Sequence, residues 1–282
     1  MHRVADTVCP GMTAWVILPV SLSVSTITAL WVVYVVAVQN HHVCPVDNWT
    51  YNESCDENIG QDEHKRCCTL DKIPLVSKCG TLPPESCLFS LICNIGSFMV
   101  MLLGLLRYAQ VMERHQKSLL NTAALVTCWS CAAGLIIVGN FQVDNARVLH
   151  YVGAGVGFPS SMLFICFQSV ITYKIAKNSL DYRIGHCRAV LTIVAFINLV
   201  LSGVFFVQES SNLQHAAAIC EWVFTIVILI FYGTFAVEFG SITQNTLLEM
   251  LTKEAQKSHC KADSNRIPGT HINCTQEAVA MI

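Results

Sequence analysis

The chain alternates between long apolar segments and short polar ones. Six apolar segments come close to the length of about 20 residues that a helix needs to cross the hydrocarbon of a bilayer. They lie at 13–39, 88–106, 120–140, 151–173, 189–207 and 216–237. Trp15, Trp31 and Tyr34 sit near the two ends of the first segment, as aromatic residues do at membrane interfaces. The pattern predicts an all-α integral membrane protein with a bundle of six transmembrane helices.

The composition supports a membrane protein. The 282 residues are 53% hydrophobic and 13% charged, whereas soluble domains carry about 25% charged residues. The mean hydropathy is +0.50. A net charge of −2 gives no reason to expect a nucleic-acid partner. The first apolar segment is longer than the 7–15 residues or so of a signal-peptide core, and no small-x-small cleavage site follows it. We therefore expect it to stay in the protein as a span.

The polar segments differ in their Lys and Arg content, which predicts the orientation. Segments 1–12, 107–119, 174–188 and 238–282 carry most of the 17 Lys and Arg residues. The other three segments, 40–87, 141–150 and 208–215, carry only Lys65, Arg66, Lys72, Lys78 and Arg147. Basic residues favour the cytosolic side, so both termini are predicted to be cytosolic.

The segment 40–87 has the marks of an extracellular, disulfide-rich first loop. Asn48 and Asn52 each begin an N-glycosylation sequon. Six cysteines are candidates for three disulfides, whose connectivity the sequence leaves open: Cys44, Cys55, Cys67, Cys68, Cys79 and Cys87. We interpret the loop as a stapled, glycosylated cap in preference to a dedicated ligand-binding loop, because about 48 residues form a poor core without bridges.

Three polar residues fall inside the predicted spans, toward the outer side: Asn94, Asn140 and Glu221. Such residues either hydrogen-bond between helices, at about 0.6–2 kcal/mol each, or mark a functional site for a lipid or an ion. A third alternative is a metal-dependent lipid hydrolase that uses the outer His42, His150 and His215. No His-x-x-x-His or His-Glu-x-x-His spacing supports it, so the structural interpretation is favoured. The sequence predicts no catalytic residue, no metal site and no cofactor.

Further features concern packing and the inner side. Gly153 and Gly157 form a small-residue stripe that lets a neighbouring helix approach closely. At the inner ends of two spans, Arg107 and Glu238 either pair or Arg107 extends to lipid headgroups. The inner loops 107–119 and 174–188 are basic, which favours an anionic leaflet. The tail 238–282 lacks a core pattern, is predicted to be disordered, and ends in "EAVAMI".

Several stretches resemble the transmembrane protein 150 family, most closely its A-type branch. They are "NHHVCPVDNWTYNESC", "PPESCLFS", "GNFQVDNARVLHYVGAGVGFP", "LSGVFFVQESSNLQHAAAICEW" and "FYGTFAVEFG". The family belongs to a superfamily with the damage-regulated autophagy modulators and a yeast regulator of phosphatidylinositol 4-kinase. The resemblance covers about residues 12–240 and the terminal "AVAMI".

The resemblance implies a non-enzymatic, multi-pass protein of the plasma membrane. Members of this type help to place the phosphatidylinositol 4-kinase type III complex, and so maintain plasma-membrane phosphoinositides. The implied partners are that complex with its membrane scaffold, met by the cytosolic tail, and membrane lipids. An autophagy or lysosomal modulator, as in the sister branch, and a channel subunit or modulator are the alternatives.

Overall fold

The structure is a computed structural model that describes residues 14–52, 68–114 and 118–240. Six helices in this part are long and apolar enough to cross a membrane: α1 (Ile17–Gln39), α3 (Glu85–Arg114), α4 (Leu119–Asn140), α5 (Arg147–Ile175), α6 (Ser179–Phe206) and α7 (Ser211–Gly233). The shorter elements are η1 (Ala14–Val16), η2 (Leu70–Lys72), α2 (Val76–Cys79) and α8 (Phe235–Phe239). The predicted six-span, all-α fold is confirmed.

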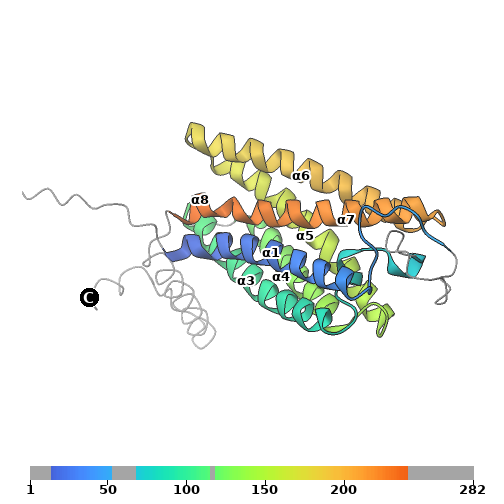
Figure 1. The fold of residues 1–282 in the computed structure, drawn as a ribbon. Coiled ribbons are helices and arrows are strands. Elements are labelled where there is room, and N and C mark those ends of the chain that lie inside the picture. The colour runs from blue at the N-terminus through green and yellow to red at the C-terminus, as the bar shows by residue number, and fades with distance from the viewer. Residues whose placement is uncertain (1–13, 53–67, 115–117, 241–282) are drawn as a thin grey trace, which may run out of the picture. The chain divides into compact units, whose positions relative to one another are not determined.

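The long helices form a ring in chain order. Each packs against the next one along the chain, and α7 packs against α1 to close the ring. The connections from α3 through α7 are short and make these successive helices antiparallel, and the connections collect at two ends (Figure 1). We call the end with residues 40–52 and 68–84 the loop end, and the end with α8 the Glu238 end. The loop end also holds the connections 141–146 and 207–210.

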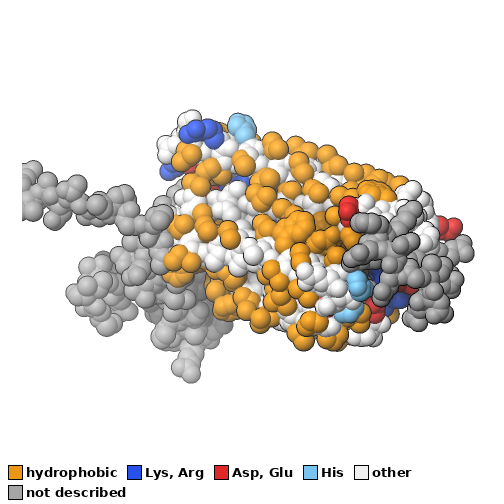
Figure 2. All heavy atoms as spheres, viewed as in Figure 1, with side chains coloured by type: hydrophobic (Ala, Val, Ile, Leu, Met, Phe, Trp, Pro, Cys, Tyr) orange, Lys and Arg blue, Asp and Glu red, His pale blue; other side chains and the backbone are white. Residues whose placement is uncertain are grey.

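The outer surface of the ring is apolar, as a bilayer requires. Large hydrophobic side chains are exposed along the helices, among them Val24, Phe98, Val126 and Phe196. Figure 2 shows hydrophobic side chains over the flank of the bundle, with charged side chains toward its ends. Lipid chains are as apolar as these residues, so the surface that would aggregate in water is suited to a membrane.

The predicted glycine stripe does bring two helices together. A Cβ added at Gly134 of α4 would lie 2.6 Å from the Cα of Gly157 and 2.7 Å from the carbonyl oxygen of Gly153 on α5. No side chain fits in that space. The contact is ordinary helix packing at close range, as the sequence favoured.

The helices extend beyond the predicted spans, most of all at the start of α6. The sequence placed 174–188 in a loop, but α6 begins at Ser179. The reason is a capping box, in which the Asp181 carboxylate accepts hydrogen bonds from the backbone N–H groups of Lys177 and Asn178 at 3.0 and 3.2 Å. The predicted N-tail, the predicted disordered tail beyond 240, Cys55 and Cys67 lie outside the described residues.

Candidate functional site

The loop after α1 is fixed to the start of α3 by one buried carboxylate. Glu85 is 2% exposed. Its two oxygens contact the side-chain amide of Asn40 at 2.6 Å and Nδ1 of His42 at 3.1 Å. A buried carboxylate needs such partners, because an unpaired charge is costly away from water. Glu85 therefore ties both ends of the first loop together.

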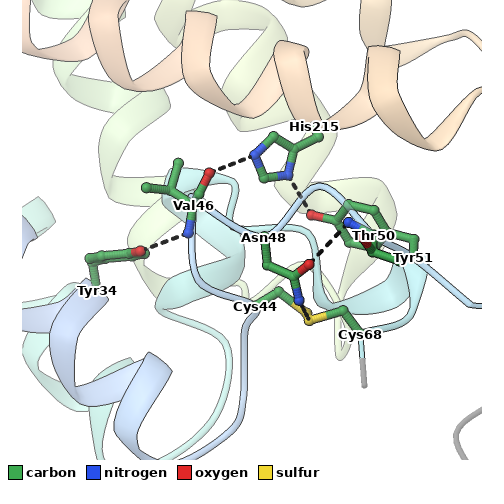
Figure 3. The surroundings of a disulfide bond; sticks show 8 residues. All are labelled: Tyr34, Cys44, Val46, Asn48, Thr50, Tyr51, Cys68 and His215. Carbon is green, nitrogen blue, oxygen red and sulfur yellow. Dashed lines mark hydrogen bonds between the residues drawn. A yellow bond between two sulfur atoms is a disulfide. The ribbon is translucent and has the colours of Figure 1, made fainter. Parts of the chain in front are cut away.

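The first loop holds a disulfide between Cys44 and Cys68 (Figure 3). Asn48, a predicted glycosylation acceptor, lies against it. The Asn48 amide donates to Sγ of Cys68 at 3.2 Å, and its carbonyl accepts the backbone N–H of Thr50 at 3.0 Å. The other described acceptor, Asn52, is exposed. A disulfide predicted for this loop is thus present, and this pair is compatible with only three of the 15 possible connectivities.

Two other cysteines of the predicted set differ from the prediction. Cys79 and Cys87 carry free thiols in the described structure. They lie in unlike surroundings, because Cys79 is buried at the end of α2 whereas Cys87 is exposed on the first turn of α3. Burial raises the pKa of the Cys79 thiol. For Cys55 and Cys67 the disulfide prediction is untested.

His215 at the start of α7 is the main contact between the bundle and the first loop (Figure 3). Its Nε2 lies 3.0 Å from the carbonyl oxygen of Val46, and its Nδ1 lies 2.5 Å from the hydroxyl of Tyr51. A carbonyl can only accept, so Nε2 carries the proton and Nδ1 accepts from Tyr51. The ring of Trp49 packs on the imidazole at 4.2 Å between centroids, and His215 is fully buried.

The same helix holds the second half of the loop. Trp222 Nε1 donates to the carbonyl of Pro74 at 2.9 Å. Glu221 accepts backbone hydrogen bonds from Val76 and Ser77 at the start of α2. The favoured interpretation had Glu221 hydrogen-bond between helices, and its backbone partners lie in α2, a short helix of the first loop. This part of the first loop therefore contacts side chains of a spanning helix. A prediction of separate spans does not include such a contact.

Asn94 and Asn140 join helices, as the favoured interpretation expected. The Asn94 amide donates to Oδ1 of Asn140 at 3.2 Å, and the Asn140 amide donates to Oδ1 of Asn94 at 3.0 Å. This reciprocal pair links α3 to α4. Each amide also donates to a carbonyl in its own helix, at Ser90 and Ile136. The two residues therefore stabilise the bundle and have little capacity left for a ligand.

Beneath the loop end the ring encloses a cavity of about 680 Å³, lined by residues from all six long helices and from the first loop. Charged and polar residues surround its mouth: Asp71, Lys78, Asp144, Arg147 and Gln214. Lys78 pairs with Asp144 at 2.7 Å. The depth is apolar, with Val100, Leu135, Phe158, Phe224 and Ile228. Pockets of roughly 300–1,000 Å³ hold small ligands in many proteins.

A buried ion cluster lies at the Glu238 end. Arg188 of α6 donates from Nη1 and Nη2 to the Glu238 carboxylate at 2.5 and 2.6 Å, and Arg107 of α3 lies 3.2 Å from the same carboxylate. Neither arginine is exposed. Arg188 stacks over the ring of Phe235 at 4.3 Å. Of the two alternatives for Arg107, pairing with Glu238 is confirmed.

Hydrogen bonds satisfy the rest of the cluster. Arg107 donates to Gln168 at 3.1 Å and to Gln110 at 2.7 Å. Arg188 donates to Thr172 at 2.6 Å and to Thr234 at 2.9 Å. Residues of α3, α5, α6, the turn at Thr234 and α8 thus form one cluster around the Glu238 carboxylate. Arg188 was not predicted, because residues 174–188 were assigned to a loop. The capping box at Asn178 and Asp181 was the available signal that a helix begins before Arg188.

The histidines do not gather into a metal site. Within the described residues no group of three or more His, Cys, Asp or Glu side chains is placed to hold a metal ion. His42, His150 and His215 instead contact separate partners, respectively Glu85, the carbonyl of Phe141 and the Tyr51–Val46 pair.

The fold and these contacts define a multi-pass membrane protein whose first loop is locked onto a helical ring. A family described as the Frag1/DRAM/Sfk1/Cwh43P N-terminal domain matches residues 14–242. The chain belongs to this family. No solved structure gives a significant match to the chain.

Individual relatives are similar over most of their length. The chain is 57% identical to human Transmembrane protein 150A and 55% identical to the Xenopus laevis protein of that name. Each alignment spans 272 residues, 96% of this chain and all of the relative. A Xenopus tropicalis protein named Modulator of macroautophagy TMEM150B is 31% identical over 81% of this chain and 87% of its own length. The predicted family relationship is confirmed.

Proposed function

We propose that the chain is a non-enzymatic plasma-membrane adaptor that helps to localise a phosphatidylinositol 4-kinase type III complex and so maintains plasma-membrane phosphoinositides. The observation that carries this proposal is the identity of 55–57% to Transmembrane protein 150A over the full length of those relatives. Such an adaptor needs a rigid membrane part and a cytosolic part that meets the kinase complex.

Charge distribution supports the orientation that this function needs. At the Glu238 end, Lys174, Lys177 and Arg183 are exposed, and Figure 2 shows basic side chains over that end of α6. The loop end carries the disulfide and the sequons instead. By the positive-inside rule, this distribution favours a cytosolic Glu238 end. Exposed basic residues near an anionic leaflet contribute about 1 kcal/mol each to its attraction.

The ion cluster supports the adaptor by fixing the last described helix. Glu238 holds α8 to α3 and α6 through Arg107 and Arg188. The end of α8 at Phe239 is therefore fixed, and segment 241–282 follows it in the sequence. In this proposal that segment and the basic inner loops contact the kinase complex, and the kinase partner supplies all catalysis.

The proposal is tested by phosphatidylinositol 4-phosphate recovery in cells that lack the endogenous protein. After acute depletion of the lipid, full-length protein is expected to restore plasma-membrane recovery, and a variant ending at residue 240 is expected not to. A matched control neutralises Lys65 and Arg66 in the first loop, on the opposite side. Equal recovery with the truncated and full-length proteins, both present at the cell surface, would contradict the adaptor.

A second candidate is a modulator of macroautophagy, favoured by the 31% identity to relatives with that name. Imaging and autophagic flux separate the two candidates. A mostly lysosomal protein whose loss changes flux, with normal phosphoinositide recovery, would favour the second.

A further inference from the structure

The cavity inside the helical ring is not used by the adaptor function proposed above. Residues of all six long helices line it, yet side chains do not fill it. Gly96 of α3 illustrates this: it is buried, and a Cβ added there would meet no atom within 4 Å. Buried glycines elsewhere in the ring behave differently, since a Cβ at Gly139 would lie 2.4 Å from Cβ of Cys93. The open space at Gly96 is therefore particular to the cavity.

The cavity is long enough to hold an acyl chain. Along α7 its lining runs from Gln214 to Tyr232, which corresponds to about 27 Å at the helical rise. One leaflet contributes about 15 Å, half of the ~30 Å hydrocarbon core, so the lined length of the cavity exceeds the depth of one leaflet. An apolar space of this length loses dispersion contacts unless apolar atoms occupy it. A hydrocarbon chain satisfies that requirement along the apolar side chains, while Ser161, Glu221 and Tyr232 add polar atoms to the lining.

The cavity also opens toward the membrane between α5 and α6. Gly155 of α5 and Gly203 of α6 both line it and are both exposed. A Cβ at either position would meet no atom within 4 Å. Above them Tyr151 and Phe206 meet edge to face, with ring centroids 6.3 Å apart. A chain can enter through this seam from the bilayer without crossing water.

The mouth determines the headgroup. The charged residues that line the cavity are three acids and two bases: Lys78 pairs with Asp144, Asp71 and Arg147 are exposed, and Glu221 is buried. Both signs of charge at one opening complement a headgroup that carries both a phosphate and an amine. We propose that the cavity binds a zwitterionic phospholipid, with an acyl chain among the apolar side chains and the headgroup at the loop end.

The test uses full-length protein in nanodiscs that contain phosphatidylcholine with a photoactivatable acyl chain. Crosslinks are expected on cavity residues such as Val100 and Ile228. Crosslinks confined to membrane-facing residues such as Phe98 and Val126 would overturn the proposal, because bulk lipid alone reaches those. Phosphatidylglycerol carrying the same chain is expected to crosslink less within the cavity. An equal or stronger signal from this anionic lipid would overturn the headgroup assignment.

Gly96→Leu places a larger side chain in the cavity, at a position where an added Cβ meets no atom within 4 Å. The new side chain excludes about three methylenes of the ligand, which corresponds to an affinity loss of about fiftyfold. The matched control is Ala133→Leu on the exposed face of α4, which is expected to leave cavity crosslinking unchanged. Full cavity labelling of folded Gly96→Leu would contradict the proposal. If that variant does not fold, Gly203→Leu provides the same test at the membrane opening.

Discussion

Replacing Glu238 should destabilise the whole Glu238 end. The carboxylate is shared by two arginines with no exposed surface, and its own side chain is 12% exposed. Removing one partner of a buried ion pair costs about 3–5 kcal/mol, because the remaining charge is left without compensation. Two guanidiniums share this loss in Glu238→Gln. We expect a decrease of about 3 kcal/mol in the free energy of unfolding, at the lower limit because Gln retains a hydrogen-bond acceptor.

The assay is denaturant unfolding of purified protein in detergent, with hydrogen exchange of the α8 amides as a local measurement. Exchange in 235–239 should accelerate more than in α4, which does not contribute to the cluster. The matched control is Glu113→Gln, an exposed acid near the end of α3, with an expected change within about 0.5 kcal/mol. The backbone carbonyl of Glu238 still accepts from Gln110 at 2.8 Å, so α8 should loosen without losing every contact.

A double-mutant cycle separates the pair from its surroundings. Arg188→Met removes a buried charge and keeps most of the packing volume over Phe235. Combined with Glu238→Gln, it should cost less than the sum of the two single changes, with a coupling of about 1–3 kcal/mol. Additive losses, or a Glu238→Gln loss below about 1 kcal/mol, would refute the claim that this ion pair holds α8.

Other predictions concern the loop end. Asn52 should be the main glycosylation site, because Asn48 is held against the disulfide; Asn52→Gln is expected to remove most of the glycosidase-sensitive gel shift, and Asn48→Gln little of it. At pH 8 without reductant a maleimide should label exposed Cys87 and not Cys79, whose raised pKa and burial keep it a protonated thiol; equal labelling would contradict this. His215→Ala should speed proteolysis within the first loop while the six spans stay intact, whereas unchanged proteolysis would show that His215 does not hold it.

The sequence predicted the six spans, because each is a long apolar segment whose meaning does not depend on its neighbours. The Asn94–Asn140 contact was within reach for a related reason: polar groups in hydrocarbon must find partners, and both residues lie toward the same membrane side. The start of α6 was missed because its first turns are polar. The hydropathy pattern therefore placed the start of the span at 189, after the true start of the helix at Ser179.

The tertiary contacts of the loop end were not predictable. His215 contacts Val46 across 169 positions of sequence, and nothing local marks either residue as the partner of the other. Glu221 was singled out correctly as a buried acid, but its partners are backbone groups of a loop, which leave no trace in side-chain pattern. The cavity is a property of six helices together, and the absence of a Cβ at Gly96 matters only once the ring is closed.

We propose that this membrane protein acts as an adaptor through segment 241–282, which is predicted to be cytosolic. Affinity purification from isolated plasma membranes tests it most directly, comparing full-length protein with a variant that ends at residue 240. The account predicts that the phosphatidylinositol 4-kinase type III complex copurifies with the full-length protein and is lost from the shortened one. Absence of the kinase from both, or equal recovery with both, would contradict it.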